Sequence, residues 1–418
     1  MRVAPWSARA LTLARHATLG ALVGVLCGAS SALFLVLLDR ATRWREAHEA
    51  VVYALPLAGL CVGAVYARFG ARIKGGNNLV IDALHDGGPE IPLRMAPMVL
   101  LGTVLTHLFG GSAGREGTAV QMGASLADAL SHRLGADGST RRLLLASGVA
   151  GGFGAVFGTP IAGAVFAMEL TTLGRADYAA LLPALTAALV GDLVTRGLGV
   201  GHTSYPAAPS VPLTPGLGAK WLVFALAVAA VSAAFIELTH GLKRLGERHI
   251  RHLPVRLALG GVVVVALWRG VGTSDYLGLG VPGIVRAFGD PTMAPWAFAL
   301  KLLFTAVTLG AGFLGGEVTP LFFLGAALGN ALAGPLQIPL ALSAGVGFAA
   351  VFAAASNTPL ALSIMAVELL GAGALPHVVI VSVVAWLLTG HRSIYTAQRL
   401  GRVKGGDAVE RPVPLREL

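Results

Sequence analysis

Apolar stretches about as long as a lipid bilayer is thick recur along almost the whole chain. They lie at about residues 17–39, 51–67, 95–110, 143–170, 179–199, 218–238, 254–268, 294–315, 318–334, 338–355, 358–371 and 376–389. Only 12% of the residues are charged, whereas soluble proteins carry about 25%. Lipid is therefore the expected solvent, and this composition excludes a soluble enzyme, a disordered protein and a disulfide-rich scaffold.

Glycine and proline interrupt many of these stretches. In lipid an unpaired backbone group is costly, so a broken helix is tolerated only where it faces protein or a water-filled cavity. The breaks therefore predict an all-α polytopic membrane protein with a transport pathway. They are at Pro97, Gly151-Gly152, Pro160, Pro282, Gly315-Gly316, Pro320 and Pro359.

The net charge of +10 comes from short basic clusters between the apolar stretches. Such clusters are typical of the cytoplasmic loops of membrane proteins, and a nucleic-acid partner is not expected. Both termini are basic, so we expect both in the cytoplasm, with residues 399–418 as a short cytoplasmic tail. The clusters are Arg40–Arg45, Arg68–Lys74, Arg133–Arg142, Lys243–Arg256 and Arg392–Arg416.

The chain also repeats itself. Thr159–Leu170 reads TPIAGAVFAMEL and Thr358–Leu369 reads TPLALSIMAVEL, with six identities in twelve positions. Upstream of each copy lies a glycine-rich break with an acid, GREGT at 114–118 and GGEVT at 315–319. Duplicated halves with interrupted helices predict a transporter whose site lies between the repeats. We place the repeats at 17–200 and 216–398.

The GREGT segment has the chemistry of an anion gate. Its glycines allow a sharp turn, and a helix is expected to begin near Arg115, with free N–H groups that attract an anion. Glu116 could occupy that anion position when ionised and leave it when protonated, which would make it both gate and proton carrier. The alternative is a carboxylate that only stabilises the helix dipole.

The second break repeats this arrangement. Pro320 suits the first turn of a helix, which places Glu317 just before the helix among apolar and aromatic residues. A carboxylate there is costly unless it is protonated, paired or hydrated. We therefore expect Glu317 to be protonated when an anion binds, or to be held aside by Thr319 or Asn78. A satisfied structural carboxylate is the alternative.

Other chemistry lacks support in the sequence. His48-Glu49 begins an HExxH pattern, but Val52 stands where the second histidine is needed, so no metal site is predicted. The sequence contains no Gly-Lys-Ser/Thr phosphate loop and no nucleophile–base pair. We expect no catalytic residues, no cofactor and no enzyme activity.

These motifs together resemble the CLC family of anion channels and proton-coupled anion exchangers. GREGT looks like the family's gating motif, GGEVTP like its later GGxFxP motif, and HRSIYTAQRL like the terminal helix that supplies a pore tyrosine, here Tyr395. The resemblance covers nearly the whole chain in the right order. It implies a homodimer of inverted repeats whose broken helices meet at a midplane anion site.

Three departures from the chloride-handling members resemble the bacterial fluoride/proton antiporter branch. GGNNLV at 75–80 puts Asn77 at or beside the position of a selectivity serine, and GEVTP carries the additional acid Glu317. Chloride exchangers have two adjacent acids where this chain has Glu169 and Leu170. The internal proton route must therefore differ, and Glu317 is the obvious substitute.

The resemblance implies export of cytoplasmic fluoride in exchange for protons across the bacterial inner membrane. Fluoride holds water tightly, so a site that strips this water must offer strong hydrogen-bond donors. A chloride/proton exchanger or a passive anion channel, with chloride as a possible substrate, is the alternative. The expected gating and proton-coupling residues are Glu116 and Glu317, and the expected anion-binding residues are Gly76, Asn77, Asn78, Gly117, Val318, Thr319 and Tyr395.

Overall fold

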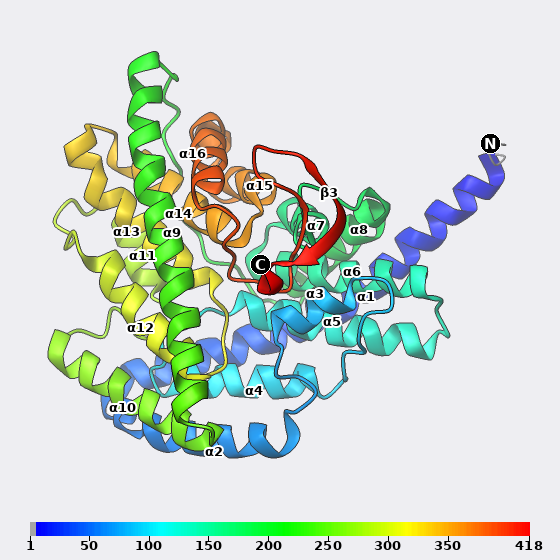
Figure 1. Cartoon of the computed structure of the whole chain (residues 1–418), viewed down its shortest axis with the longest axis horizontal. Coiled ribbons are helices and arrows are strands. Elements are labelled where there is room, and N and C mark those ends of the chain that lie inside the picture. The colour runs from blue at the N-terminus through cyan, green and yellow to red at the C-terminus, as the bar shows by residue number, and fades with distance from the viewer. Residues whose placement is uncertain (1–5) are drawn as a thin grey trace.

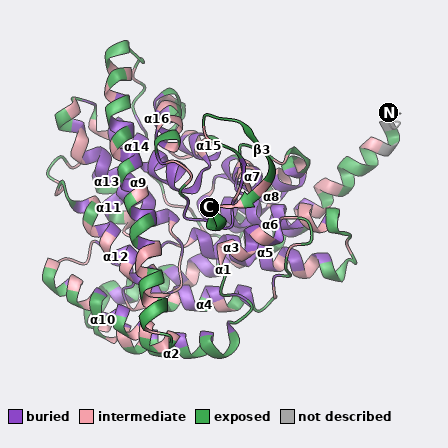
Figure 2. Cartoon of the chain, in the orientation of Figure 1, coloured by how far each residue is buried: buried purple, intermediate pink, exposed green. Residues whose placement is uncertain are grey.

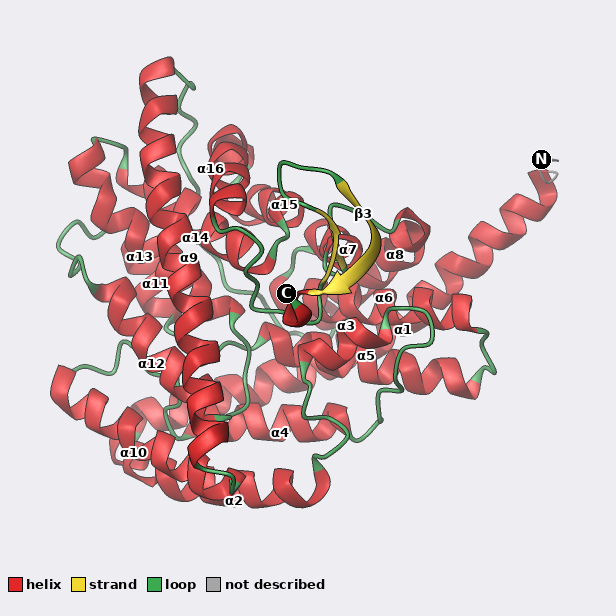
Figure 3. Ribbon diagram, viewed as in Figure 1, coloured by secondary structure: helices red, strands yellow, loops and turns green. Residues whose placement is uncertain are grey.

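A computed structural model describes residues 6–418 as a largely helical body (Figures 1 and 3). The first half contains α1 (Trp6–Ala47), α2 (Leu55–Phe69), α3 (Asn77–Ala83), α4 (Met95–Leu108), α5 (Glu116–Arg133), α6 (Gly138–Phe157), α7 (Pro160–Glu169) and α8 (Leu181–Gly197). The second half contains α9 (Pro215–His249), α10 (Leu253–Val271), α11 (Val281–Ala287), α12 (Ala297–Ala311), α13 (Val318–Leu336), α14 (Leu340–Ser356), α15 (Pro359–Leu370) and α16 (Leu375–Leu388). Short 3₁₀ helices cover Glu49–Ala54, Tyr178–Ala180, Ala372–Ala374 and Leu415–Glu417.

The two halves run through helices of matching kind in the same order. Each opens with a long helix, α1 or α9, and each has a seven-residue helix, α3 or α11, in third place. Six helices within residues 6–418 are long and apolar enough to cross a membrane. The all-α polytopic fold predicted from the apolar stretches is therefore confirmed.

The predicted breaks at the prolines and at Gly315-Gly316 lie at or within one turn of a helix start. The break predicted at Gly151-Gly152 is wrong, because both glycines lie inside α6, where Gly152 lets the helix pack closely against the Ala119 carbonyl of α5. Helix α6 ends at Phe157 and is followed by Gly158, whose φ of 73° suits glycine, and α7 begins at Pro160. In the second half, α14 is followed by Asn357, which has a φ of 60°, and α15 begins at Pro359. Both helices stop because the chain enters a left-handed conformation, and both successors begin with a proline that needs no N–H partner.

Small residues let neighbouring helices pack backbone to backbone. A Cβ atom on Gly148 of α6 would lie 2.5 Å from the carbonyl oxygen of Gly123 on α5. Gly325 of α13 and Gly347 of α14 meet in the same reciprocal way in the second half. These pairs explain why glycine is frequent in helices that must hold a site rigidly between them.

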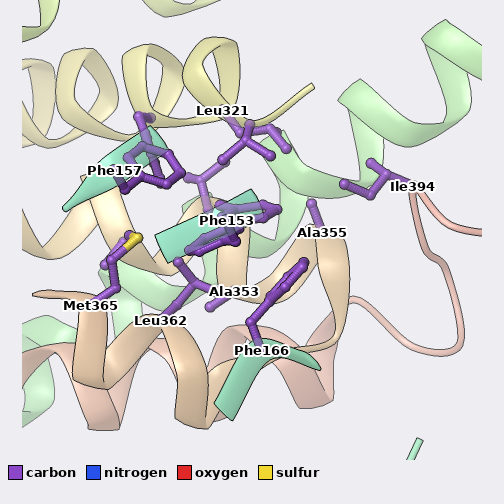
Figure 4. Close-up of a cluster of buried hydrophobic side chains, with 14 of the residues drawn as sticks. Phe153, Phe157, Phe166, Leu321, Ala353, Ala355, Leu362, Met365 and Ile394 are labelled. Carbon is purple, nitrogen blue, oxygen red and sulfur yellow. The ribbon is translucent and has the colours of Figure 1, made fainter. Parts of the chain in front are cut away.

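The core lies where the two halves meet (Figure 2, purple). The rings of Phe153 and Phe166 stack with centroids 4.6 Å apart, and Phe157 contacts Phe322 of the second half at 5.3 Å. Side chains from both halves interleave around these rings (Figure 4). The outer faces of α2 and α10 are exposed instead, as expected for helices that face lipid.

A small sheet beside the C-terminus was not predicted. It has the order β1 (Thr172–Leu173), β2 (Arg399–Arg402) and β3 (Ala408–Pro414), parallel between the first two and antiparallel between the last two. The strand β3 lies beside the end of the chain (Figure 3, yellow). Residues 399–418 are thus an ordered element that packs against the helical body.

The predicted terminal helix around HRSIYTAQRL is wrong. Residues 391–398 form turns and irregular structure, because tertiary partners take up their backbone N–H groups. The N–H of Ile394 donates to the carbonyl of Ala355, and that of Ala397 donates to the Asn78 side chain. These bonds replace the local ladder that a helix would need.

Candidate functional site

The two glycine-rich breaks pair with each other at the centre of the molecule. Gly114 N–H donates to the Gly316 carbonyl at 2.6 Å, and Gly316 N–H donates back to Gly114 at 2.8 Å. Gly315 has a φ of 153°, a conformation that favours glycine. This antiparallel bridge brings together the N-termini of α5 and α13, which are both positive ends of helix dipoles.

Glu116 lies between these two helix ends and is fully buried. Its Oε1 accepts a hydrogen bond from the Thr319 hydroxyl at 2.5 Å, and its Oε2 accepts one from the Thr319 N–H at 3.1 Å. The N–H of Arg115 also donates to Oε2 at 3.1 Å, and the Arg115 Nε lies 3.5 Å from Oε1. The carboxylate thus occupies donors from both halves of the chain, not only those of its own helix.

Glu317 lies immediately before α13, as predicted from Pro320. Its Oε2 is shielded from water and has no hydrogen-bond partner among the described residues. The Thr319 hydroxyl is engaged elsewhere, because it donates to Glu116, and the Asn78 side-chain oxygen accepts from Ala397. No hydrogen bond joins Glu317 to Thr319 or Asn78 among the described residues, and the expectation that Glu317 is protonated or held aside when an anion binds stays a prediction.

The Asn77 side chain approaches Glu317 from the first half of the chain. The side-chain amide of Gln121 donates to Asn77 Oδ1 at 3.2 Å, which turns the Asn77 NH₂ group inward. A Cβ atom on Gly117 would lie 2.8 Å from this NH₂ nitrogen and 3.7 Å from Glu317 Oε2. Asn77, Gly117 and Glu317 therefore converge, and a side chain at 117 would displace the Asn77 amide.

Asn78 and Tyr395 belong to one local structure. The bond from Ala397 N–H to Asn78 Oδ1 is 2.9 Å long and ties α3 to the irregular segment that contains Tyr395. The N–H of Tyr395 donates to Ser393 Oγ at 3.0 Å, and the tyrosine is 4% exposed. Tyr395 reaches the site from the end of the second half, whereas Asn78 comes from the first.

A cavity of about 480 Å³ connects these groups. Among its lining residues are four predicted anion-binding residues and one predicted coupling residue, namely Gly76, Asn77, Asn78, Tyr395 and Glu317. Glu116, Gly117, Val318 and Thr319 lie behind this lining, and the Val318 side chain is buried. Basic side chains give the cavity wall an excess of positive charge; they are Lys74, Lys243, Arg251 and Arg256, with Glu247 as a counter-charge.

Two supporting residues escaped the sequence analysis. Gln121 orients Asn77, and its position one turn after Gly117 on the gating helix was an available signal. Thr103 shares a hydrogen bond of 2.7 Å with Thr118 and so braces α4 against α5. Nothing in the local sequence around Thr103 marks this contact, because its partner lies on another helix.

Residues 58–390 match the family described as voltage gated chloride channel. The chain belongs to this CLC family. It is 46% identical to the "Chloride/fluoride channel protein" of Pseudomonas syringae pv. tomato, over 96% of this chain and 89% of that relative. It is 26% identical to the "H(+)/Cl(-) exchange transporter ClcA" of Vibrio vulnificus, over 84% and 81%.

Solved structures agree with this assignment. The "Crystal structure of a CLC-type fluoride/proton antiporter" superposes with a TM-score of 0.89 at 36% identity, covering 95% of this chain and 99% of that one. A slow cyanobacterial Cl⁻/H⁺ antiporter superposes with a TM-score of 0.80 at 18% identity, covering 93% and 95% of the two chains. The second likeness concerns the CLC fold only.

Proposed function

We propose that this chain is a secondary active transporter that exports cytoplasmic fluoride in exchange for protons. One observation carries the proposal: a free, water-shielded oxygen of Glu317 converges with the Asn77 amide beside the Thr319-bound Glu116. The names of a 46% identical relative and of a 36% identical solved structure add support.

The position of Glu116 favours a gate that moves with its proton. When ionised, the carboxylate takes the N–H and O–H donors of Thr319, which an incoming anion would otherwise use. A proton on Glu116 removes its charge and weakens these bonds, so the donors become available to fluoride. Binding of the proton and binding of the anion are then linked through the same two donors.

Glu317 supplies the feature that favours fluoride. An ionised Glu317 would repel an anion in the cavity, whereas a protonated Glu317 offers an O–H donor to it. Fluoride accepts stronger hydrogen bonds than chloride does, so it gains more from this donor and from the Asn77 amide. Leu170 stands where chloride exchangers have their second acid, so this chain needs another proton-binding group, and Glu317 offers one.

Proteoliposome flux tests the proposal. Fluoride efflux should carry protons into the lumen and acidify it, and a pH gradient should drive fluoride uphill. Glu116→Gln and Glu317→Gln should each abolish uphill movement, while Glu410→Gln in the exposed tail serves as the control. Retained pumping in both site variants would overturn the assignment, and faster chloride than fluoride movement in the wild type would favour the chloride exchanger. Fluoride movement that a pH gradient cannot drive would favour the passive channel.

The two halves, at 17–200 and 216–398, act in this proposal as inverted repeats around the site. The antiparallel bridge between Gly114 and Gly316 supports this, because it requires α5 and α13 to approach from opposite directions. We place the protein in the bacterial inner membrane with both termini in the cytoplasm. The basic loops and tail support this orientation. Tagging each terminus and testing protease access in oriented vesicles would measure it.

A homodimer is also part of the proposal. Glu169, at the end of α7, accepts hydrogen bonds of 2.9 and 3.2 Å from the first turn of α15. Glu368 of α15 accepts bonds of 2.8 and 3.0 Å from the first turn of α7. Both carboxylates are only partly buried, and such groups are costly against lipid. A second copy on this face would cover them, and light scattering of the purified protein tests for a dimer mass.

A further inference from the structure

The end of the chain returns to the two segments that carry the candidate anion ligands. After β3, the N–H of Leu415 donates to the Gln398 carbonyl at 2.8 Å, and the N–H of Arg416 donates to the Thr396 carbonyl at 2.9 Å. These carbonyls lie just past Tyr395. The last residues therefore form an edge along the segment that supplies the tyrosine.

The Arg416 side chain continues from there to the first repeat. Its Nη1 donates to Asp82 Oδ2 at 2.9 Å and its Nη2 donates to Asp82 Oδ1 at 3.2 Å. Such a bidentate ion pair fixes the relative orientation of the two side chains, which a single hydrogen bond does not. Asp82 lies on α3, the seven-residue helix that begins at Asn77.

Three segments thus form a closed connection. Asn78, near the start of α3, accepts the Ala397 N–H, and Asp82, near its end, holds Arg416. The start of this short helix is thus fixed to the irregular segment 391–398, and its end is fixed to the C-terminal segment that lies along it. The sheet extends the connection to the end of α7, because the Arg399 N–H donates to the Thr171 carbonyl at 3.0 Å.

We propose that the C-terminal segment 408–418 is a strap that positions the anion filter, with Arg416 as a positioning residue that acts through Asp82 on α3. It keeps the Asn77 amide of the first half in register with Tyr395 of the second. Losing the strap lets α3 move relative to Tyr395 and so relaxes the choice between fluoride and chloride. The inference deepens the proposed function and rests on it where the anion ligands are concerned.

The repeat counterpart of α3 provides an internal comparison. Helix α11, Val281–Ala287, has the same length and the same place in its half. No hydrogen bond or ion pair connects α11 to residues 408–418 in the described chain. Loss of the strap should therefore loosen α3 and leave α11 unchanged.

The experiment compares Arg416→Ala with Arg411→Ala in the full-length protein in proteoliposomes. Arg411 is exposed in the same tail, and its side chain makes no ion pair or hydrogen bond among residues 6–418. Arg416→Ala should lower the fluoride-to-chloride flux ratio by about twofold to fivefold, the range that an exposed ion pair supports. Hydrogen exchange should become faster in residues 77–84 and stay unchanged in residues 281–287. Arg411→Ala should match the wild type in both measurements.

The charge-swapped double variant Asp82→Arg/Arg416→Asp should restore part of the flux ratio, which a general loss of stability would not do. Unchanged exchange at α3, faster exchange throughout the protein, or faster exchange at α3 with an unchanged flux ratio would each overturn the strap. A wild type that moves no fluoride would overturn the proposed function instead. Exchange at α3 would then still decide whether the strap holds that helix.

Discussion

Thr319→Val isolates the contact that holds Glu116 in place. Valine has nearly the shape of threonine but lacks the hydroxyl, so it removes the 2.5 Å bond to Oε1 and keeps the backbone bond to Oε2. Glu116 is buried, and no other described side chain donates to it through an O–H group. One carboxylate oxygen therefore loses its strongest donor.

The size of the effect follows from the charge of the acceptor. A hydrogen bond to an ionised group contributes about 1.5–3 kcal/mol to the state that contains it. Because about 1.4 kcal/mol corresponds to a tenfold change in population, the Thr319-bound state of Glu116 should become about 10-fold to 100-fold less populated. If this state is required in every cycle, the rate of fluoride–proton exchange falls by a similar factor.

Fluoride efflux and proton movement, recorded together at several pH values, measure this loss. Thr319→Ser keeps the hydroxyl and should retain most of the exchange rate. Thr118→Val is the matched control at the repeat position, because its hydroxyl pairs with the neutral Thr103 and its loss should cost about 0.5–1.5 kcal/mol of stability. Wild-type exchange in Thr319→Val at every pH would refute the reasoning that this hydroxyl holds the gate.

Three further changes probe the filter, the second acid and the packing beneath them. Asn77→Ser removes the inward NH₂ donor and should lower the fluoride-to-chloride flux ratio; no change there would exclude this amide as a filter group. Glu317→Ala should fold but lose proton coupling and gain chloride flux, and full exchange activity would make Glu317 structural. Gly148→Ala puts a Cβ against the Gly123 carbonyl and should cost about 1–3 kcal/mol, seen as a lower melting temperature, whereas Gly241→Ala, with open space around it, should not.

Structural features that depend on residues close together in the sequence were predictable from it. The start of α5 at Glu116 and of α13 at Val318 follows from glycines that permit a sharp turn and from Pro320, which suits a first helical turn. The membrane-embedded fold follows equally directly, since apolar stretches cut by glycine and proline are stable only in lipid and around a pathway. The resemblance of GREGT and GGEVTP to family motifs further implied that these two breaks lie together at one anion site.

Partners across the molecule could be decided only by the tertiary structure. Thr319 was one of the candidates to hold Glu317 aside, but its hydroxyl donates to Glu116, 203 positions away. Arg416 was expected only as part of a short cytoplasmic tail, yet it binds Asp82 across 334 positions. A hydrogen bond forms wherever packing brings a donor within about 3 Å of an acceptor, and a side chain in a short polar motif has several candidates within reach. The sequence determines which groups can donate and accept at this site, and the packing of α3, α5 and α13 against the end of the chain decides which of them meet.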